Sequence, residues 1–293
     1  MLAIKITDSN AMYTVDQLND KLIDLAFSED IGDGDHTTLC CIPENAMGKS
    51  RLLIKEEGIL AGMRIAKEIF HRFDATMQIE QFMEDGTHVK PGDVPMIVSG
   101  KVRSLLQTER LMLNVMQRMS GIATMTNKYV QRLEGTHTHV LDTRKTTPGM
   151  RMLEKEAVKI GGGCNHRIGL FDMILLKDNH IDFAGGIASA LDRCAAYQKE
   201  KGLNLKVEIE CRSFDEIKQV MAHGGADRIM LDNFSIEDTK KAVELINHKF
   251  ETESSGGITY DTLRQYAECG VDYISVGALT HSVKGLDMSF KAC

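Results

Sequence analysis

The spacing of apolar residues predicts helices and strands in alternation over the first third of the chain. An Asp/Gly-rich stretch at residues 29–35 and a Pro-Gly turn at 90–93 interrupt the apolar segments. The segments themselves are predicted as helices over 15–28 and 63–73 and as strands over 50–55, 77–83 and 94–99. We therefore expect an α+β arrangement with antiparallel strands in this part.

The pattern changes after a long helical stretch over residues 104–132, which we expect to be interrupted near Ser120–Gly121. Short apolar segments then alternate with amphipathic ones. Strands are predicted over 138–141, 173–176, 205–209, 228–231, 250–252 and 273–276, and helices over 150–160, 184–200, 213–223, 235–248 and 260–269. Regular β-then-α alternation predicts a parallel sheet with right-handed crossovers.

Charged or glycine-rich residues follow one predicted strand after another. They are Asp142–Lys145, Lys177–His180, Glu208 with Glu210, Asp232–Asn233, Glu253–Gly257 and Gly277–Ala278. A β/α barrel collects its active site from the C-terminal ends of many strands, whereas an open doubly wound sheet binds ligands mainly at one switch point. The pattern favours the barrel, and six strand candidates indicate an incomplete one.

Composition narrows the kind of ligand. The formal net charge of -7 argues against nucleic-acid binding, so an anion site must be a local basic pocket. No apolar run approaches the ~20 residues of a membrane span, and the N-terminus lacks the pattern of a secretory signal. Seven cysteines without a CxxC pair indicate reduced thiols. We expect a cytoplasmic enzyme without a nucleic-acid or membrane partner.

Basic side chains follow the strand ends in three groups. The candidates are Thr143, Arg144 and Lys145 after one strand, His166 and Arg167 after the glycine-rich residues 161–163, and Lys177 after the next strand. An arginine offers a planar fork for a carboxylate or phosphate, and a lysine is a compact point charge. The alternatives are a salt-bridged surface loop around Arg144 and, for Lys177, an ion pair with Asp178 or a neighbouring strand's carboxylate.

Two carboxylates, Glu208 and Asp232, occupy neighbouring strand ends. Such a pair serves either as general acid and base or as oxygen ligands for Mg²⁺, which prefers a few carboxylates together with substrate phosphate oxygens. Glu210 is expected to point away from Glu208 or to lie just past the strand.

Two glycine-containing segments near the end of the sheet predict a phosphate site. Ser255 and Gly256 precede a helix, and Gly277 follows the last strand. Backbone N–H groups at a helix start bind anions, and β/α barrels often hold a phosphate in the loops after their last two strands.

Two further features stay open at this level. Arg110, in the long helix, is equally compatible with an exposed helical arginine and with a site residue. The acidic stretch containing Asp33, Asp35 and His36 fits a metal cluster or a turn.

Several of these segments together resemble the quinolinate phosphoribosyltransferase family over nearly the whole chain. The resemblance is carried by Glu109–Arg110, Leu113–Asn114, Ser120–Thr124, Asp142–Pro148, Gly161–Arg167, Lys177–His180, Leu231–Asn233, Glu253–Gly257 and Val276–Leu279. Each motif alone is weak, but their shared order is specific.

The resemblance implies an α/β fold of two domains. Residues 1–115 would form an N-terminal α/β sandwich, on which the tail 283–293 is expected to pack, and residues 116–282 an incomplete β/α barrel of about seven strands. It also implies a homodimer in which Arg110 reaches the neighbouring subunit's site.

The implied reaction transfers the phosphoribosyl group of phosphoribosyl pyrophosphate (PRPP) to quinolinate with decarboxylation. It yields nicotinate mononucleotide, pyrophosphate and carbon dioxide for NAD biosynthesis. Arg110, Thr143, Arg144, His166, Arg167 and Lys177 would bind substrate, Lys145 would assist pyrophosphate departure, Glu208 and Asp232 would act in catalysis and hold Mg²⁺, and Ser255, Gly256 and Gly277 would bind the 5′-phosphate.

Two alternatives belong beside this assignment. A phosphoribosyltransferase for nicotinate or another aromatic acid would need fewer cations than this chain offers. A catalytically silent barrel that binds phosphorylated metabolites would not require carboxylates at Glu208 and Asp232.

Overall fold

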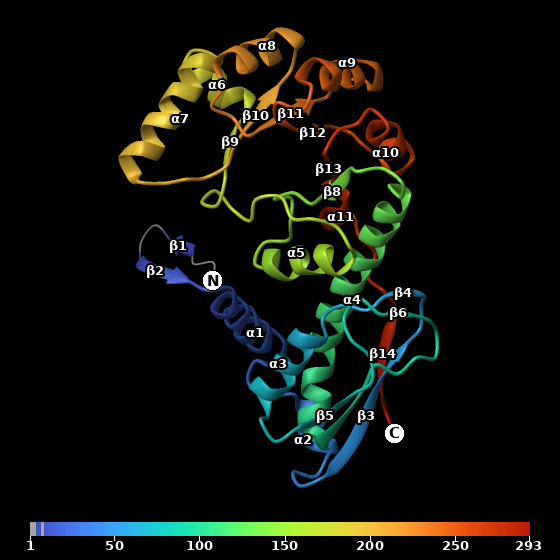
Figure 1. The fold of residues 1–293 in the computed structure, drawn as a ribbon. Coiled ribbons are helices and arrows are strands. Elements are labelled where there is room, and N and C mark those ends of the chain that lie inside the picture. The colour runs from blue at the N-terminus through green and yellow to red at the C-terminus, as the bar shows by residue number, and fades with distance from the viewer. Residues whose placement is uncertain (1–3, 7–8) are drawn as a thin grey trace. The chain divides into compact units, whose positions relative to one another are not determined.

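The computed structural model describes residues 4–6 and 9–293, and it divides the chain into two compact units (Figure 1). The mixed unit contains the chain up to Asn127 together with Lys145–Gly162 and Ala278–Cys293. The parallel-sheet unit contains Lys128–Arg144 and Gly163–Gly277. These compact units are defined by contacts and do not test the predicted boundary between two domains at residues 115 and 116, which stays a prediction.

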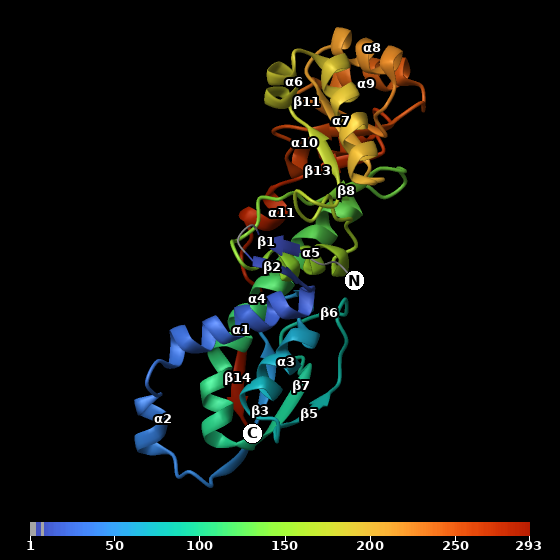
Figure 2. The ribbon, with the colours of Figure 1, turned by 90° about the vertical axis from the view of Figure 1, so that its left-hand side faces the viewer.

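The mixed unit is built on a four-stranded antiparallel sheet. Its strands lie in the order β14 (Met288–Ala292), β3 (Met47–Ile54), β7 (Met96–Lys101) and β5 (Gln78–Gln81). Helix α3 (Met63–Phe73; Figure 2) buries one apolar face. Its Phe70 packs on Phe290 of β14. The C-terminal strand thus completes a sheet formed mainly by the first third of the chain, and the expected antiparallel pairing is confirmed.

The mixed unit also contains elements outside this sheet. They are β1 (Ile4–Ile6), β2 (Ser9–Tyr13), α1 (Val15–Ile31), α2 (His36–Cys41), β4 (Gly58–Ile59), β6 (His88–Val89), α5 (Arg151–Ile160) and α11 (Ala278–His281). Asp35 caps α2 by accepting the Thr38 N–H at 3.0 Å. This cap supports the turn interpretation of the acidic stretch rather than the metal one.

Helix α4 (Val102–Arg132) runs for 31 residues without the interruption predicted at Ser120–Gly121, so that prediction was wrong. Ser120 Oγ accepts the Ala61 N–H at 2.9 Å and donates to its carbonyl at 3.0 Å. A Cβ atom at Gly121 would collide with the carbonyl of Lys284. The two small residues admit a neighbouring segment to the helix surface and do not break the helix.

The parallel-sheet unit contains six strands, all parallel. Their order is β8 (His139–Leu141), β13 (Tyr273–Ser275), β12 (Glu251–Ser255), β11 (Arg228–Asp232), β10 (Val207–Cys211) and β9 (Ile174–Leu176). A single parallel bridge joins Leu141 of β8 to Cys164. The predicted parallel α/β sheet is confirmed, with this bridge in addition to its six strands.

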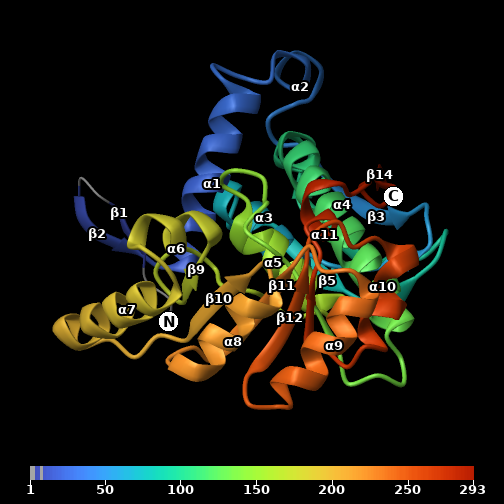
Figure 3. The ribbon, with the colours of Figure 1, turned by 90° about the horizontal axis from the view of Figure 1, so that it is seen from above.

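Helices cover the outer side of this sheet, as Figure 3 shows for α8 and α9 beside β10 to β12. The helices of the unit are α6 (Asp178–Ala184), α7 (Ile187–Lys201), α8 (Phe214–His223), α9 (Ile236–Ile246) and α10 (Tyr260–Ala267). The helix predicted over 184–200 begins later, because Gly185 and Gly186 both adopt positive φ angles and separate α6 from α7. No helix in the described part of the chain is long and apolar enough to cross a membrane.

Candidate active site

The inner face of the parallel sheet is charged, and its outer face is mainly apolar. Ile209, Ile229 and Ile274 are fully buried. Because successive side chains of a strand alternate between the faces, the neighbouring Glu208 and Arg228 point to the other side. The register pairs Glu208 with Arg228 across β10 and β11. The sheet therefore carries ionisable groups where a barrel of this kind usually holds branched apolar side chains.

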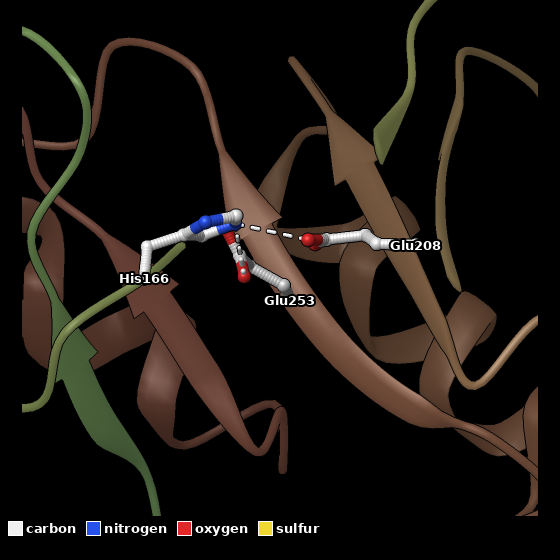
Figure 4. A group of neighbouring side chains, drawn as sticks. All are labelled: His166, Glu208 and Glu253. Atoms are coloured by element: carbon white, nitrogen blue, oxygen red, sulfur yellow. Dashed lines mark ion pairs between the residues drawn. The ribbon is translucent and has the colours of Figure 1, made fainter. Parts of the chain in front are cut away.

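A buried cluster of His166, Glu208 and Glu253 lies on this face (Figure 4). His166 Nε2 lies 2.9 Å from Glu208 Oε2 and 3.6 Å from Glu253 Oε2. The Arg167 N–H donates to His166 Nδ1 at 2.7 Å, and the His166 N–H donates to Asp142 Oδ1 at 2.9 Å. Since Nδ1 accepts a hydrogen bond, the ring proton belongs on Nε2, where it faces Glu208.

Arg228 provides a positive charge beside the carboxylates of this cluster. Its Nη1 lies 2.9 Å from Glu253 Oε2, its Nη2 lies 3.0 Å from Glu251 Oε2, and its guanidinium carbon stands 3.9 Å from the ring centroid of Tyr273. Burial raises the pKa of Glu208 to about 7, although Arg228 opposes the shift. Burial and then the charge of Glu208 raise the pKa of Glu253 to about 8. The two carboxyls titrate as a coupled pair.

Lys177 forms an ion pair with Glu210, whose Oε1 lies 2.8 Å from Nζ. Glu210 Oε2 also accepts the Asp178 N–H at 3.3 Å. The expectation that Glu210 points away from Glu208 was wrong, because residues two apart on a strand share a face. The alternative interpretation of Lys177, an ion pair with a neighbouring strand's carboxylate, is the contact that forms here.

The guanidinium groups of Arg144 and Arg167 are close enough for their positive charges to repel each other. The pKa of Arg167 is lowered, first by burial and then by the positive charge of Arg144. Arg167 Nη1 donates to the Met173 carbonyl at 3.4 Å. Repulsion between two partly buried cations falls when an anion binds beside both, so this pair favours a carboxylate or phosphate ligand.

Asp232 ends β11 and is half-buried. The Asn233 side-chain amide donates to its Oδ2 at 2.9 Å. Burial raises the pKa of Asp232, and the negative charge of Glu210 raises it further. A carboxylate that is both accessible and surrounded by acidic groups fits a divalent cation, which would favour its ionised form.

The glycine loop after β12 is closely packed on Asn233. Asn233 and Gly256 adopt φ angles of 57° and 98°, and the Asn233 N–H donates to the Ser255 carbonyl at 2.9 Å. A Cβ atom at Gly256 would collide with the Asn233 side chain. Gly256 is therefore required by the close approach and by its backbone angle.

Two predicted site residues belong to the mixed unit. Arg110 is exposed on α4, and Lys145 is exposed directly after Arg144 in the chain. The other predicted residues, Thr143, Arg144, His166, Arg167, Lys177, Glu208, Asp232, Ser255, Gly256 and Gly277, belong to the parallel-sheet unit.

Arg228 and Glu253 form part of the buried cluster, although neither was predicted as a site residue. A signal existed in the sequence, since Glu208 and Glu210 alternate in one strand, as do Glu251 and Glu253 in another. Charges that alternate along predicted strands of a buried sheet indicate a face that packs against other charges.

The fold and this face define an α/β enzyme that binds small anions at the C-terminal ends of parallel strands. Comparison with known families makes the assignment specific. Residues 35–120 match the quinolinate phosphoribosyl transferase N-terminal domain, and residues 122–291 match the C-terminal domain of the same family. The chain belongs to the quinolinate phosphoribosyltransferase family.

Individual relatives agree with this assignment. A nicotinate-nucleotide pyrophosphorylase [carboxylating] of rice, Oryza sativa, is 45% identical over 285 residues, covering 92% of this chain and 76% of the relative. A probable enzyme of the same name from Bacillus subtilis is 42% identical, covering 92% and 91%. The crystal structure of NadC from Streptococcus pyogenes superposes with a TM-score of 0.89 at 39% identity and covers 98% of both chains.

Proposed function

We propose that the residues at the C-terminal ends of the parallel strands carry out the reaction of the family on this chain. The enzyme transfers the phosphoribosyl group of PRPP to quinolinate with decarboxylation, and the products are nicotinate mononucleotide, pyrophosphate and carbon dioxide. The observation that supports these residue roles best is the Arg144–Arg167 pair, whose mutual repulsion an anionic substrate would relieve.

Quinolinate carries two carboxylates, and we assign them to the basic residues of this face. Arg144 and Arg167 offer planar forks, and Lys177 adds a point charge once its pairing with Glu210 loosens. His166 is held in place by Asp142 and Arg167, with Nε2 toward Glu208. A monocarboxylic acid such as nicotinate would leave part of this positive charge without a partner.

The proposed roles follow from the two places where charge develops during the reaction, the departing pyrophosphate and the pyridine ring. The bond between the ribose C1 and pyrophosphate breaks as the pyridine nitrogen bonds to C1, and Lys145 stabilises the negative charge that pyrophosphate gains. The ring nitrogen then carries a positive charge. The carbon–carbon bond to the adjacent carboxylate breaks as carbon dioxide leaves, its electron pair stays on the ring carbon beside that charge, and a proton replaces the carboxylate.

An assay of the purified protein tests the activity directly. With Mg²⁺ and PRPP present, we expect carbon dioxide and nicotinate mononucleotide from quinolinate and no nucleotide from nicotinate. Turnover of nicotinate instead of quinolinate would contradict the assignment of the basic residues to two carboxylates. Absence of turnover with both acids would favour a barrel that only binds phosphorylated metabolites.

Magnesium is part of the proposal, with Asp232 as its main protein ligand. Bound Mg²⁺ would neutralise pyrophosphate oxygens as their charge grows. Glu208 was predicted as the second ligand, and its contacts here are with His166 and Glu253. Asp232 is more accessible than the fully buried Glu208 and fits the oxygen chemistry of the ion better.

Asp232→Asn is expected to raise the Mg²⁺ concentration for half-maximal activity by about tenfold or more, because one charged oxygen ligand is lost. The measurement is initial rate against Mg²⁺ at saturating quinolinate and PRPP. Asp215→Asn, at an exposed position on α8, is the matched control and leaves the titration unchanged. An unaltered Mg²⁺ requirement in Asp232→Asn would remove that residue from the ion site.

We assign the 5′-phosphate of PRPP to the segment of Ser255 and Gly256 together with Gly277. Gly256→Ala is expected to raise the KM for PRPP about tenfold, because the added methyl group displaces Asn233 and the loop. Gly202→Ala shares the left-handed backbone, with a φ of 62°, but its Cβ meets no atom within 4 Å. This control therefore carries comparable strain without touching the loop, and equal KM values in the two variants would contradict the phosphate assignment.

We also propose a homodimer in which Arg110 of one protomer reaches the neighbouring site. Arg110 is exposed on α4, which is consistent with this arrangement. A cytoplasmic location is part of the proposal as well, and free thiols at all seven cysteines agree with it.

A further inference from the structure

A contact network centred on Arg118 joins three segments of the mixed unit. The Arg118 guanidinium, on α4, donates from Nε and Nη2 to Glu154 Oε1 on α5 at 2.9 and 2.8 Å. The same Nη2 donates to the Thr280 carbonyl on α11 at 2.5 Å and to Thr147 Oγ1 at 3.1 Å. One planar cation therefore contacts two helices and the loop between Arg144 and α5.

The network fixes the backbone on both sides of Thr146. Thr280 Oγ1 donates to the Lys145 carbonyl at 2.8 Å, and the Thr147 N–H donates to Glu154 Oε2 at 3.1 Å. The Glu154 side chain is fully buried, and that of Arg118 is 25% exposed. The Lys145 side chain is exposed, and its backbone carbonyl is one of the groups that the network holds.

The same contacts reach the segment that follows the last parallel strand. Helix α11 begins at Ala278, directly after Gly277, and its Thr280 both accepts from Arg118 and donates to Lys145. Arg118 and Thr280 thus join the segment after Arg144 to the segment after Gly277. The first segment carries Lys145, which is predicted to act on pyrophosphate, and the second directly follows Gly277, which is predicted to bind the 5′-phosphate.

We propose that Arg118, Glu154 and Thr280 are positioning residues that hold Lys145 for pyrophosphate departure. The inference rests on the proposed function, and it assigns roles to three residues that touch no substrate. A side chain that stabilises a transition-state charge must be placed within a fraction of an ångström, and misplacement by ~1 Å costs about 10²-fold in rate. Two backbone anchors, one at Lys145 and one at Thr147, provide that placement.

Arg118→Lys is the direct test, because a lysine keeps the charge but loses the planar fork that reaches all three partners. We expect kcat to fall about 10- to 100-fold, with a smaller change in the KM for quinolinate. The matched control is Arg64→Lys. Arg64 also pairs with α5, through Glu156 at 2.7 Å, and the contacts that place it there do not include the Lys145 loop. The control is expected to keep kcat while losing similar thermal stability.

Thr280→Val provides a second variant of nearly the same volume that removes the hydroxyl donating to the Lys145 carbonyl. Its kcat is expected to fall in the same direction. Hydrogen exchange of peptides covering residues 145–149, followed by mass spectrometry, gives a readout that needs no turnover. Exchange should be faster in Arg118→Lys and Thr280→Val than in the parent, and unchanged in Arg64→Lys.

The outcomes separate the inference from the proposed function. Equal kcat losses in Arg118→Lys and Arg64→Lys would indicate general destabilisation of α5, and an unchanged kcat in Arg118→Lys would also overturn the positioning role. If the parent protein turns over no substrate, the proposed function fails. The exchange comparison then still decides whether these residues anchor the Lys145 segment.

Discussion

Lys145→Ala is expected to lower kcat about 10²- to 10³-fold, the usual cost of removing one preorganised group that stabilises developing charge. Folding should hardly change. The Lys145 side chain is exposed, and its backbone carbonyl, which Thr280 holds, is retained in alanine. The free energy of unfolding is therefore expected to change by less than about 0.5 kcal/mol. Steady-state kinetics and urea denaturation of the same preparation measure both quantities.

Lys159→Ala is the control, because Lys159 is an exposed lysine in the last turn of α5. It should match the parent in kcat. Full activity in Lys145→Ala would exclude this lysine from the mechanism, and an equal loss in both variants would point to a nonspecific effect of surface charge.

The same variant tests the proposed dimer. Arg110→Ala and Lys145→Ala should each be nearly inactive alone. In a mixed dimer, the site with an intact Lys145 would receive Arg110 from the Lys145→Ala protomer and would be complete. Recovery of activity on mixing after dissociation and reassociation is therefore expected, and its absence would contradict an Arg110 supplied by the neighbouring protomer.

The sequence predicted the fold well where apolar periodicity and strand-end chemistry agreed. All six parallel strands were located, but β10 and β12 extend further than predicted. The predicted strands were taken from runs of apolar residues. Both predictions therefore ended too early, because β10 continues through Glu210 and β12 through Glu253. Similarly, Ser120 and Gly121 suggested a helix break, although their small size serves close packing against Ala61 and Lys284.

The sequence predicted which types of residue follow the strand ends. It did not predict which of these side chains contact one another across different strands. Sequence spacing suggested Glu208 with Asp232 as a pair. Instead, Glu208 contacts His166, a residue of an irregular loop, and Glu253. Arg228 was missed because it begins a strand, away from the end where ligands bind. Its role follows from its burial beside Glu253, a residue of a different strand.

Arg228→Met is expected to be the most destabilising substitution on the charged face. Its side chain is 10% exposed and pairs with the fully buried Glu253 at 2.9 Å and with Glu251 at 3.0 Å. Methionine fills comparable volume but leaves buried carboxylates without their cation. Breaking a buried ion pair from one side costs about 3–5 kcal/mol. Arg193→Met, at an exposed position of α7, should change the free energy of unfolding by less than about 0.5 kcal/mol.

This loss should depend on pH. The pKa values of Glu208 and Glu253, about 7 and about 8, lie above the ~4.3 of an unfolded glutamate. Groups with raised folded pKa values contribute stability that is fully present below the unfolded pKa and is lost as pH rises through the folded values. The parent should therefore lose stability from pH 5 to pH 8. Arg228 lowers both pKa values, so without it the decline becomes steeper, and the difference between variant and parent is largest at pH 8.

Urea denaturation of parent and variant at pH 5.5 and pH 8 measures this difference. The double variant Arg228→Met/Glu253→Gln removes one of the three carboxyls that the arginine compensates, and one of the two that titrate in this range, so it should recover part of the stability at pH 8 and little at pH 5.5. A loss of equal size at both pH values would show that Arg228 stabilises through its packing on Tyr273 and its ion pair with Glu251, which stays ionised over this range because its pKa is lowered, rather than through the titrating carboxyls. In that case the protonation of Glu208 and Glu253 does not depend on the arginine. The charges of these two carboxyls would then be compensated by His166.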